Sequence, residues 1–166
     1  MDNSAAPLAP SSLPLRVVLD SNVWIDILVF EDPATRPILA ALEARTLEAL
    51  IDARCLNELT RVLDYPQFAR YDIDKAEALS KVARLSTLVA PEAPESERPL
   101  PKCKDRDDQK FLELAHAAQA AWLVSKDRAV LKCARRVARD FAFQIAEPKP
   151  FVAAFETHIN ATAAID

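Results

Sequence analysis

Four carboxylates at the edges of apolar segments are the side chains of this sequence whose type and spacing are best suited to chemistry. They are Asp20, Glu58, Asp108 and Asp127. Carboxylates that gather in one pocket repel one another unless a cation lies among them. A cluster of carboxylate oxygens therefore predicts a site for a hard divalent cation, and such a site is suited to chemistry on phosphate groups.

The positions of these acids predict how they come together. Asp20 ends the apolar run at residues 15–19, and Asp127 follows the apolar segment 122–124 by two polar residues. The other two acids lie early in predicted helices. In a parallel α/β sheet the carboxyl ends of the strands share one edge, where ligands bind. Acids that are far apart in the sequence are therefore expected to meet in one pocket.

Each of these acids also has a purely structural explanation. Ser21 and Asn22, which follow Asp20, are suited to cap the N-terminus of a helix, and so is Asp127. Glu58 lies beside the apolar stripe of its helix, where a solvated glutamate is ordinary. Asp20 is harder to explain in this way, because a carboxylate at the end of a wholly apolar strand is partly buried. The conjunction of several acids at strand-to-helix junctions is what favours a functional site.

A second group of acids immediately precedes or begins the helix predicted over residues 106–120. Asp105, Asp107 and Asp108 lie where negative charge complements the dipole of a helix, so a structural role accounts for all three. Helical spacing places both Asp107 and Asp108 at the edges of the apolar face. The spacing alone does not choose between these two residues.

Apolar segments alternate with helical patterns along the chain. Strands are predicted at residues 15–19, 47–53 (where the end of a helix is the alternative), 122–124 and 141–145. Helices are predicted from about residue 22 and over residues 37–45, 56–63, 74–88, 106–120, 127–139 and 151–155. This alternation predicts an α/β fold with a central parallel sheet covered on both faces. We expect one domain at residues 15–157, between tails at residues 1–14 and 158–166.

The composition predicts a soluble chain without a ready-made phosphate loop. The 166 residues carry a net charge of -4 and include no glycine. A Gly-rich phosphate loop is thereby excluded, and turns that need a positive φ must use Asn or Asp or be avoided. Three cysteines without paired metal spacing predict reduced thiols and a cytoplasmic protein. No apolar run is long enough to span a bilayer, and no secretory signal is recognisable.

Positive charge is concentrated in two stretches, although the chain as a whole is acidic. One stretch contains Lys126–Arg128 and Lys132–Arg139, and the other contains Lys102, Lys104 and Arg106. A solvated helix face explains either stretch. Because both stretches flank the candidate carboxylates, a strip that guides phosphate groups toward an acidic centre is the functional alternative.

Four segments carry the candidate acids in order along the chain. They are Leu19-Asp20-Ser21-Asn22-Val23-Trp24, Leu56-Asn57-Glu58-Leu59, Cys103-Lys104-Asp105-Arg106-Asp107-Asp108-Gln109-Lys110-Phe111-Leu112-Glu113-Leu114-Ala115 and Leu123-Val124-Ser125-Lys126-Asp127. The third, an acidic run followed by an apolar helix, is the most specific. Taken together, the segments resemble the PIN domain, and most closely its bacterial branch of toxin components of toxin–antitoxin systems. The resemblance covers residues 15–155.

The resemblance implies a metal-dependent endoribonuclease with a three-layer α/β/α PIN-like fold. The acidic quartet of the family, which would hold Mg²⁺ or Mn²⁺ and carry the catalysis, maps onto Asp20, Glu58, Asp108 and Asp127. Asp108 rather than Asp107 matches the family acid, because Phe111 and Ala115 follow it at the intervals found in the family. Supporting roles are expected for Asn22, Ser21 and Asp105. Contacts to RNA are expected from Lys126, Arg128 and Lys104.

The resemblance also implies partners and shows two departures. The implied partners are an RNA substrate and a small antitoxin that presents a helix and a cationic side chain to the acidic pocket, and a homodimer is common in the family. Lys126 and Gln119 stand where this branch often has glycine. The ammonium group of Lys126 is able either to reach a phosphate or to pair with a carboxylate, and the sequence does not decide which.

Two other functions compete with the nuclease. A receiver-like signalling domain also gathers acids around Mg²⁺, but it needs an adjacent pair of acids after its first strand, and Asp20-Ser21-Asn22 fits that requirement poorly. In a non-catalytic protein-binding module the acids would serve as helix caps. Weak or absent binding of Mn²⁺ would favour this module.

Overall fold

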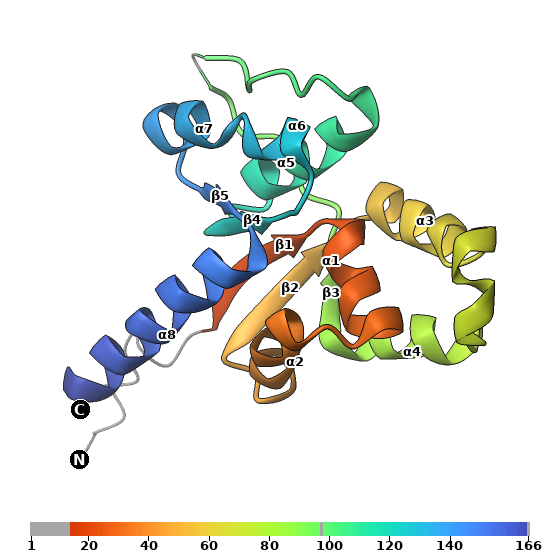
Figure 1. The fold of residues 1–166 in the computed structure, drawn as a ribbon. Coiled ribbons are helices and arrows are strands. Elements are labelled where there is room, and N and C mark those ends of the chain that lie inside the picture. The colour runs from red at the N-terminus through yellow and green to blue at the C-terminus, as the bar shows by residue number, and fades with distance from the viewer. Residues whose placement is uncertain (1–13, 97, 166) are drawn as a thin grey trace.

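The computed structural model of the chain describes residues 14–96 and 98–165, and side chains up to residue 160. A five-stranded sheet lies at its centre, with all strands parallel in the order β3-β2-β1-β4-β5 (Figure 1). The strands are β1 (Leu15–Leu19), β2 (Leu47–Ile51), β3 (Ser86–Leu88), β4 (Trp122–Val124) and β5 (Gln144–Ala146). The tail expected at residues 1–14 lies outside the described residues, except for Pro14.

Strand β1 lies in the middle of the sheet because its residues are apolar on both faces. Residues 17–19 are buried, as is usual in a parallel sheet that is covered on both sides. On one side Leu15 pairs with Leu47 of β2, and on the other Val17 pairs with Trp122 of β4. The second pairing brings the carboxyl ends of β1 and β4 together, although they are far apart in the sequence.

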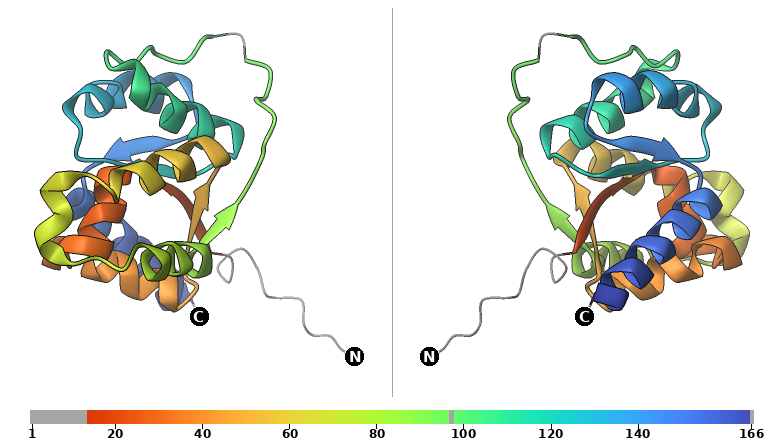
Figure 2. Two further views of the ribbon diagram at one scale, coloured as in Figure 1. Left: turned by 90° about the vertical axis from the view of Figure 1, so that its right-hand side faces the viewer. Right: turned by 90° about the vertical axis from the view of Figure 1, so that its left-hand side faces the viewer.

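Helices cover both faces of the sheet (Figure 1 and Figure 2). The α-helices are α1 (Ser21–Ile25), α2 (Arg36–Glu43), α3 (Ala53–Val62), α4 (Lys75–Leu85), α5 (Gln109–Ala117), α6 (Arg128–Leu131), α7 (Ala134–Asp140) and α8 (Pro148–Ile165). Shorter turns are the π-helical η2 (Asp26–Phe30) and the 3₁₀ turns η3 (Pro33–Thr35), η4 (Pro66–Tyr71) and η5 (Arg106–Asp108). Helices α5 to α7 lie on one side of the sheet, and α1, α2 and α8 lie on the other. The expected three-layer α/β/α arrangement is therefore present.

The boundaries of several elements differ from the sequence expectations. The segment 74–88 was expected to be one helix, and this prediction was wrong at its end: α4 stops at Leu85, and Ser86–Leu88 forms the edge strand β3 beside β2. The last strand begins at Gln144 rather than residue 141. Helix α8 continues beyond residue 155 to Ile165. No helix in the described part of the chain is both long and apolar enough to cross a bilayer.

The segments η2, α2, η4 and α5 of this glycine-free chain end one or two residues before a residue with left-handed backbone angles. Positive φ values occur at Glu31 (48°), Arg45 (65°), Asp72 (48°) and Gln119 (55°). The expectation that Asn or Asp would take such positions holds for Asp72 only. Gln119 directly follows the C-cap of α5 and adopts the conformation that a glycine would favour there. Each of these non-glycine residues stores about 1 kcal/mol of backbone strain.

Candidate functional site

Asp20 lies at the carboxyl end of β1 and points into the fold rather than capping α1. Its backbone carbonyl accepts hydrogen bonds from the amides of Val23 and Trp24, which start the helix, but its side chain makes no capping bond. The residue is only 3% exposed. Oδ2 accepts a hydrogen bond of 2.7 Å from the hydroxyl of Ser125, which is fully buried. The helix-cap explanation therefore does not account for this carboxylate.

Burial raises the pKa of Asp20 from 3.8 to about 6. The hydrogen bond from Ser125 opposes this rise, because it favours the charged form, whereas the negative charges of Glu58 and Asp127 add to it. Two acids that the sequence singled out are therefore close enough to Asp20 to act on its ionisation.

Asp127 lies at the carboxyl end of β4, where it caps α6. Its Oδ1 accepts a hydrogen bond of 2.7 Å from the amide of Ala129, as the capping explanation predicts. Its own amide donates to the hydroxyl of Ser125 at 3.0 Å. Ser125 therefore connects Asp127 to Asp20, and the sequence reasoning missed this role because an isolated Ser carries no signal of it.

Asp108 ends the turn η5 and is buried, with 9% of its surface exposed. Within the described residues, its Oδ2 has no hydrogen-bond partner although the atom is buried. Burial, together with the negative charges of Asp20, Asp127 and Asp105, raises the pKa of Asp108 to about 7. A buried carboxylate oxygen without a donor is costly, so this atom is suited to a cation or to a proton.

Glu58 reaches the same centre from α3 but is held by two donors. The hydroxyl of Ser21 donates to Oε2 at 2.5 Å, and Lys110 Nζ donates to Oε1 at 2.7 Å. Lys110 also donates to the backbone carbonyl of Asp107. Both ends of the Lys110–Glu58 pair are largely buried. The sequence reasoning assigned no role to Lys110, which lies two residues after Asp108.

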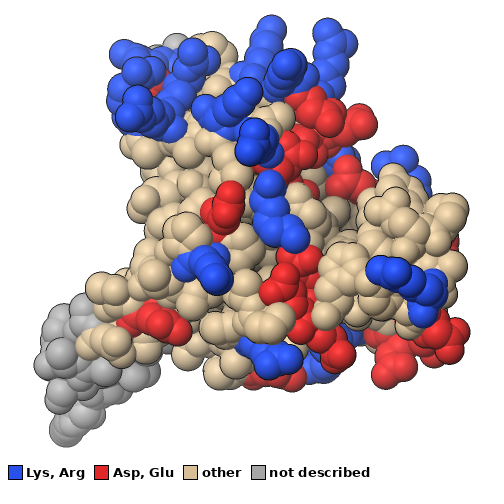
Figure 3. Space-filling view, viewed as in Figure 1, with Lys and Arg blue, Asp and Glu red and all other residues tan. Residues whose placement is uncertain are grey.

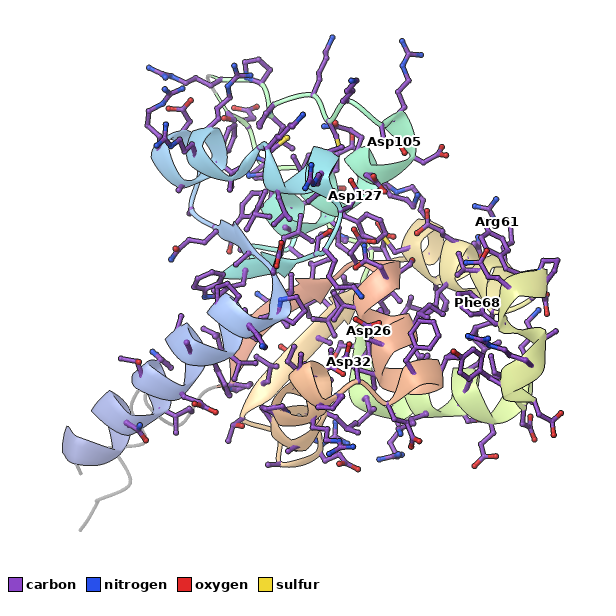
Figure 4. The ribbon with its side chains drawn as sticks, in the orientation of Figure 1. Asp26, Asp32, Arg61, Phe68, Asp105 and Asp127 are labelled. Carbon is purple, nitrogen blue, oxygen red and sulfur yellow. The ribbon has the colours of Figure 1, made fainter. Side chains whose placement is uncertain are left out.

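Lys126 is anchored to α1 and η2 by both its backbone and its side chain. Its amide donates to Oδ1 of Asn22 at 3.3 Å, and its ammonium group pairs with Oδ2 of Asp26 at 2.6 Å. Asp26, which Figure 4 labels on the same side of the sheet as α1, has a side chain that is 3% exposed. The open question about Lys126 is thereby answered for this structure, because it pairs with a carboxylate. Asp26 itself was not recognised from the sequence.

The remaining predicted residues lie at the surface around this centre. Asp105 caps η5 by accepting a hydrogen bond of 3.0 Å from the amide of Asp107. Both of these acids are exposed, and Figure 4 labels Asp105 above Asp127. Arg128 begins α6 and Lys104 precedes Asp105; both side chains are exposed. These cations therefore border the acids without pairing with them.

The strand-end acid Asp52 follows β2 but has a structural role. Its Oδ1 accepts a hydrogen bond of 2.9 Å from the amide of Cys55 at the start of α3, and Oδ2 pairs with Arg54 at 3.2 Å. Arg54 in turn pairs with Glu113 of α5 at 2.6 Å. Asp52, Arg54 and Glu113 line a cavity of about 780 Å³, together with residues of the proline-rich segments 91–96 and 98–104. This cavity lies beside the acidic centre and contains none of the four predicted acids.

The four predicted acids act on one another electrostatically, although they do not form a ready-made coordination sphere. Asp20 is affected by Glu58 and Asp127, and Asp108 is affected by Asp20 and Asp127. In residues 14–96 and 98–165, no group of three or more Asp, Glu, His or Cys side chains is arranged to hold a metal ion as it stands. The structure therefore brings the quartet into one electrostatic centre, with Glu58 drawn toward Lys110.

The raised pKa of Asp20 predicts that stability in EDTA falls as pH rises. In the unfolded chain Asp20 ionises near pH 3.8, whereas in the folded protein its pKa is about 6. The stabilisation that follows from this raised pKa is therefore complete below pH 3.8 and is lost as pH rises through about 6. The loss in unfolding free energy is roughly 3 kcal/mol. We expect the unfolding free energy of the wild type to fall by this amount relative to Asp20→Asn. Denaturant titrations across this pH range measure the difference, and a difference independent of pH would contradict the expectation.

Comparison with known proteins places the chain in a family. The sequence pattern of the PIN domain matches residues 16–129, which include all four acids. The crystal structure of PAE2754 from Pyrobaculum aerophilum is similar over 98% of this chain and 99% of that chain, with 17% sequence identity and a TM-score of 0.45. Comparison with curated proteins gives no match. The match of this sequence pattern to residues 16–129 confirms the resemblance to the PIN domain that the four sequence segments indicate. The chain therefore belongs to the PIN domain family, whose members are generally nucleases.

Proposed function

We propose that the protein is a metal-dependent endoribonuclease and that Asp20, Glu58, Asp108 and Asp127 form its catalytic centre. The observation that carries this proposal is the buried Oδ2 of Asp108, which lacks a donor within the described residues; burial and the charges of neighbouring acids raise the pKa of this residue to about 7. A fold that buries mutually repelling carboxylates loses stability unless a ligand offsets the repulsion. Membership of a family whose nucleases act on RNA supports the choice of substrate.

The donor set fits Mg²⁺ or Mn²⁺. All of its candidate ligands are carboxylate oxygens, which these hard cations prefer, and Asp20, Asp108 and Asp127 would hold the ion with Glu58 at its edge. When bound, such an ion supplies a water of lowered pKa and offsets negative charge on a phosphate. The chain itself provides orientation: Ser125 holds Oδ2 of Asp20 in place, and the anchored turn at Lys126 holds the segment that carries Asp127.

The cysteines do not offer an alternative nucleophile. Cys55, Cys103 and Cys133 are buried. Burial raises the pKa of the Cys103 thiol to about 11 and that of the Cys55 thiol still further. Because the thiolate is the reactive form, these thiols are inert near neutral pH. Water activated at the acidic centre is therefore the nucleophile that the proposal requires.

Replacing Lys110 with Met is expected to strengthen binding of Mn²⁺ by about tenfold. Lys110 Nζ donates a hydrogen bond of 2.7 Å to Oε1 of Glu58. The ammonium group therefore competes with a metal ion for that oxygen and also repels the ion. Two like charges near a protein surface repel each other by about 1–4 kcal/mol, and a tenfold change in affinity corresponds to about 1.4 kcal/mol of binding free energy. Calorimetric titration with Mn²⁺ measures the change. Lys149→Met, on the exposed surface of α8, is the control, and equal affinity in the two variants would contradict the expectation.

The nuclease proposal is tested by incubating a mixed pool of structured and single-stranded RNA with purified protein in Mn²⁺, in Mg²⁺ and in EDTA. Cleavage is expected with metal and not in EDTA, and it should be absent from a folded Asp20→Asn/Asp108→Asn variant. Equal cleavage by the wild type and this variant would reveal a contaminant and refute the proposed site. Failure to bind Mn²⁺ or to cleave any RNA would favour a non-catalytic protein-binding module.

We further propose that the protein is the toxin of a toxin–antitoxin pair, acting in the cytoplasm with a small antitoxin as its partner. The support is the similarity of the four acidic segments to that bacterial branch of the family. Expression of the wild type is then expected to arrest bacterial growth, whereas the Asp20→Asn/Asp108→Asn variant is expected to be harmless at the same protein level. Normal growth with an active wild-type enzyme would instead indicate a nuclease with another cellular role.

A further inference from the structure

A groove of about 470 Å³ brings together the two basic stretches of the sequence. It lies between the loop that ends at Lys104 and the helices α6 and α7, and no acidic side chain of the described residues lines it. We call it the basic groove, and the cations that line it are Lys102, Lys104, Lys132, Arg135, Arg136 and Arg139. Figure 3 shows Lys and Arg side chains gathered over this part of the molecule. Since the whole chain carries a net charge of -4, this concentration of positive charge is local.

Most of these cations have no counter-ion in the part of the chain that the structure describes. Arg139 pairs with Asp140 at 2.9 Å. The other five form neither a salt bridge nor a side-chain hydrogen bond with any described residue. Neighbouring like charges repel and destabilise the fold, so an unpaired group of this kind is suited to an anionic ligand.

The basic groove is continuous with the acidic centre. Ala129 lines the groove, and its amide donates the 2.7 Å hydrogen bond to the carboxylate of Asp127. On the opposite wall, Lys104 immediately precedes Asp105, whose charge raises the pKa of Asp108. An anionic polymer that lies in the groove therefore comes close to Asp127 and Asp105, at the edge of the acidic centre.

We propose that the basic groove binds the phosphate backbone of single-stranded RNA on one side of the bond to be cleaved. The proposal rests on the proposed nuclease function and adds to it the path of the substrate. In the part of the chain that the structure describes, no aromatic side chain lines the groove. The groove therefore offers no platform for stacking bases, and it reads the backbone rather than the sequence. Arg135 and Arg139 are four residues apart on α7 and lie on neighbouring positions of its surface. Lys132, at the C-cap of α6, and Arg136 of α7 line the same groove.

The test measures binding apart from cleavage. A short fluorescein-labelled oligouridine is titrated in EDTA with Asp20→Asn/Asp108→Asn protein, and fluorescence anisotropy gives Kd at several salt concentrations. The log of the binding constant falls as the log of the salt concentration rises, and each phosphate contact on a single strand contributes about 0.7 to the steepness of this slope. Adding Lys132→Ala and Arg136→Ala is therefore expected to make the slope shallower by about 1.4. At about 0.1 M salt this corresponds to on the order of 25-fold weaker binding.

A matched control removes the same charge elsewhere. Arg36→Ala and Lys149→Ala, on the exposed surfaces of α2 and α8, are expected to leave both Kd and the slope unchanged. Melting curves of all variants verify that each is folded. Equal loss of binding in the groove variant and the control would show that net charge alone determines binding, and it would overturn the proposal.

The remaining outcomes separate this inference from the nuclease proposal. If the groove variant binds oligouridine as tightly as its parent while the wild type cleaves RNA, the groove assignment fails and the nuclease stands. If the groove variant alone loses binding but the wild type cleaves nothing, the groove assignment stands and the nuclease fails. If phosphatidylserine vesicles bind through the groove and oligouridine does not, the RNA assignment is overturned in favour of a membrane surface.

Discussion

Asp108→Asn is expected to reduce RNA cleavage by about two to three orders of magnitude while raising stability in EDTA. The loss follows from removing one of the charges that would hold the metal ion and stabilise the transition state. The gain follows because the ionised Asp108 is buried, has an oxygen without a donor and is repelled by Asp20 and Asp127. We expect about 1 kcal/mol of added stability near pH 8, a shift of roughly 2–4 °C in Tm. Single-turnover cleavage and melting curves measure the two effects.

The neighbouring Asp107→Asn is the control for this variant. It removes the same charge one residue earlier, from an exposed position whose backbone carbonyl, not its carboxylate, contacts Lys110. Cleavage and Tm should both remain close to those of the wild type. If Asp107→Asn abolished cleavage and Asp108→Asn did not, the assignment of the acid would be wrong, and the sequence ambiguity between these residues would be resolved the other way.

Lys126→Met is expected to lower the unfolding free energy by about 2–3 kcal/mol and to impair cleavage. Within the described residues, the 2.6 Å contact with Lys126 is the one ion pair of the Asp26 carboxylate, which is almost fully buried. Removing one partner of a buried pair leaves an uncompensated charge, and the loss is placed below the usual 3–5 kcal/mol because Lys126 is partly exposed. Cleavage falls because the turn that carries Asp127 loses its anchor on η2. Denaturant titration and turnover at saturating RNA measure these effects.

The double variant Asp26→Asn/Lys126→Met distinguishes an anchor from a phosphate contact. Removing the buried charge together with its partner should restore most of the lost stability, which a thermodynamic cycle over the two single variants quantifies. Arg128→Met, an exposed cation two residues away, should leave stability unchanged. If Lys126→Met kept full stability and weakened only RNA binding, the contact with Asp26 would be incidental and Lys126 would act on the substrate.

Local patterns in the sequence were sufficient to predict the strands that matter most for the site. The apolar run at residues 15–19 predicts a buried strand from local sequence alone. The position of Asp20 at the carboxyl end of that strand follows from the same pattern. The order of strands and helices predicts the parallel sheet. The confirmed family relationship covers residues 16–129, which contain the same short segments.

Features that depend on partners distant in the sequence could not be predicted. The strand Ser86–Leu88 continues the apolar spacing of α4 and becomes a strand only by pairing with β2. Asp26 occupies an ordinary helical position until the turn after β4 places Lys126 against it. Ser125 is likewise unremarkable until β4 lies beside β1 and its hydroxyl meets Asp20. Tertiary contacts decide each of these cases, and no local propensity contains them.

The pairing of β1 with β4 also governs when the acidic centre can exist during protein synthesis. A ribosome delivers Asp20, Glu58 and Asp108 first, and Asp127 follows only after β4 has been made. The amide of Asp20 then donates a hydrogen bond to the carbonyl of Val124 at the end of that strand. Products of interrupted translation that end just before β4 therefore contain Asp20, Glu58 and Asp108, but they lack Asp127 and the strand that completes the centre. For a nuclease that acts on RNA, this order delays activity until most of its own message has been translated.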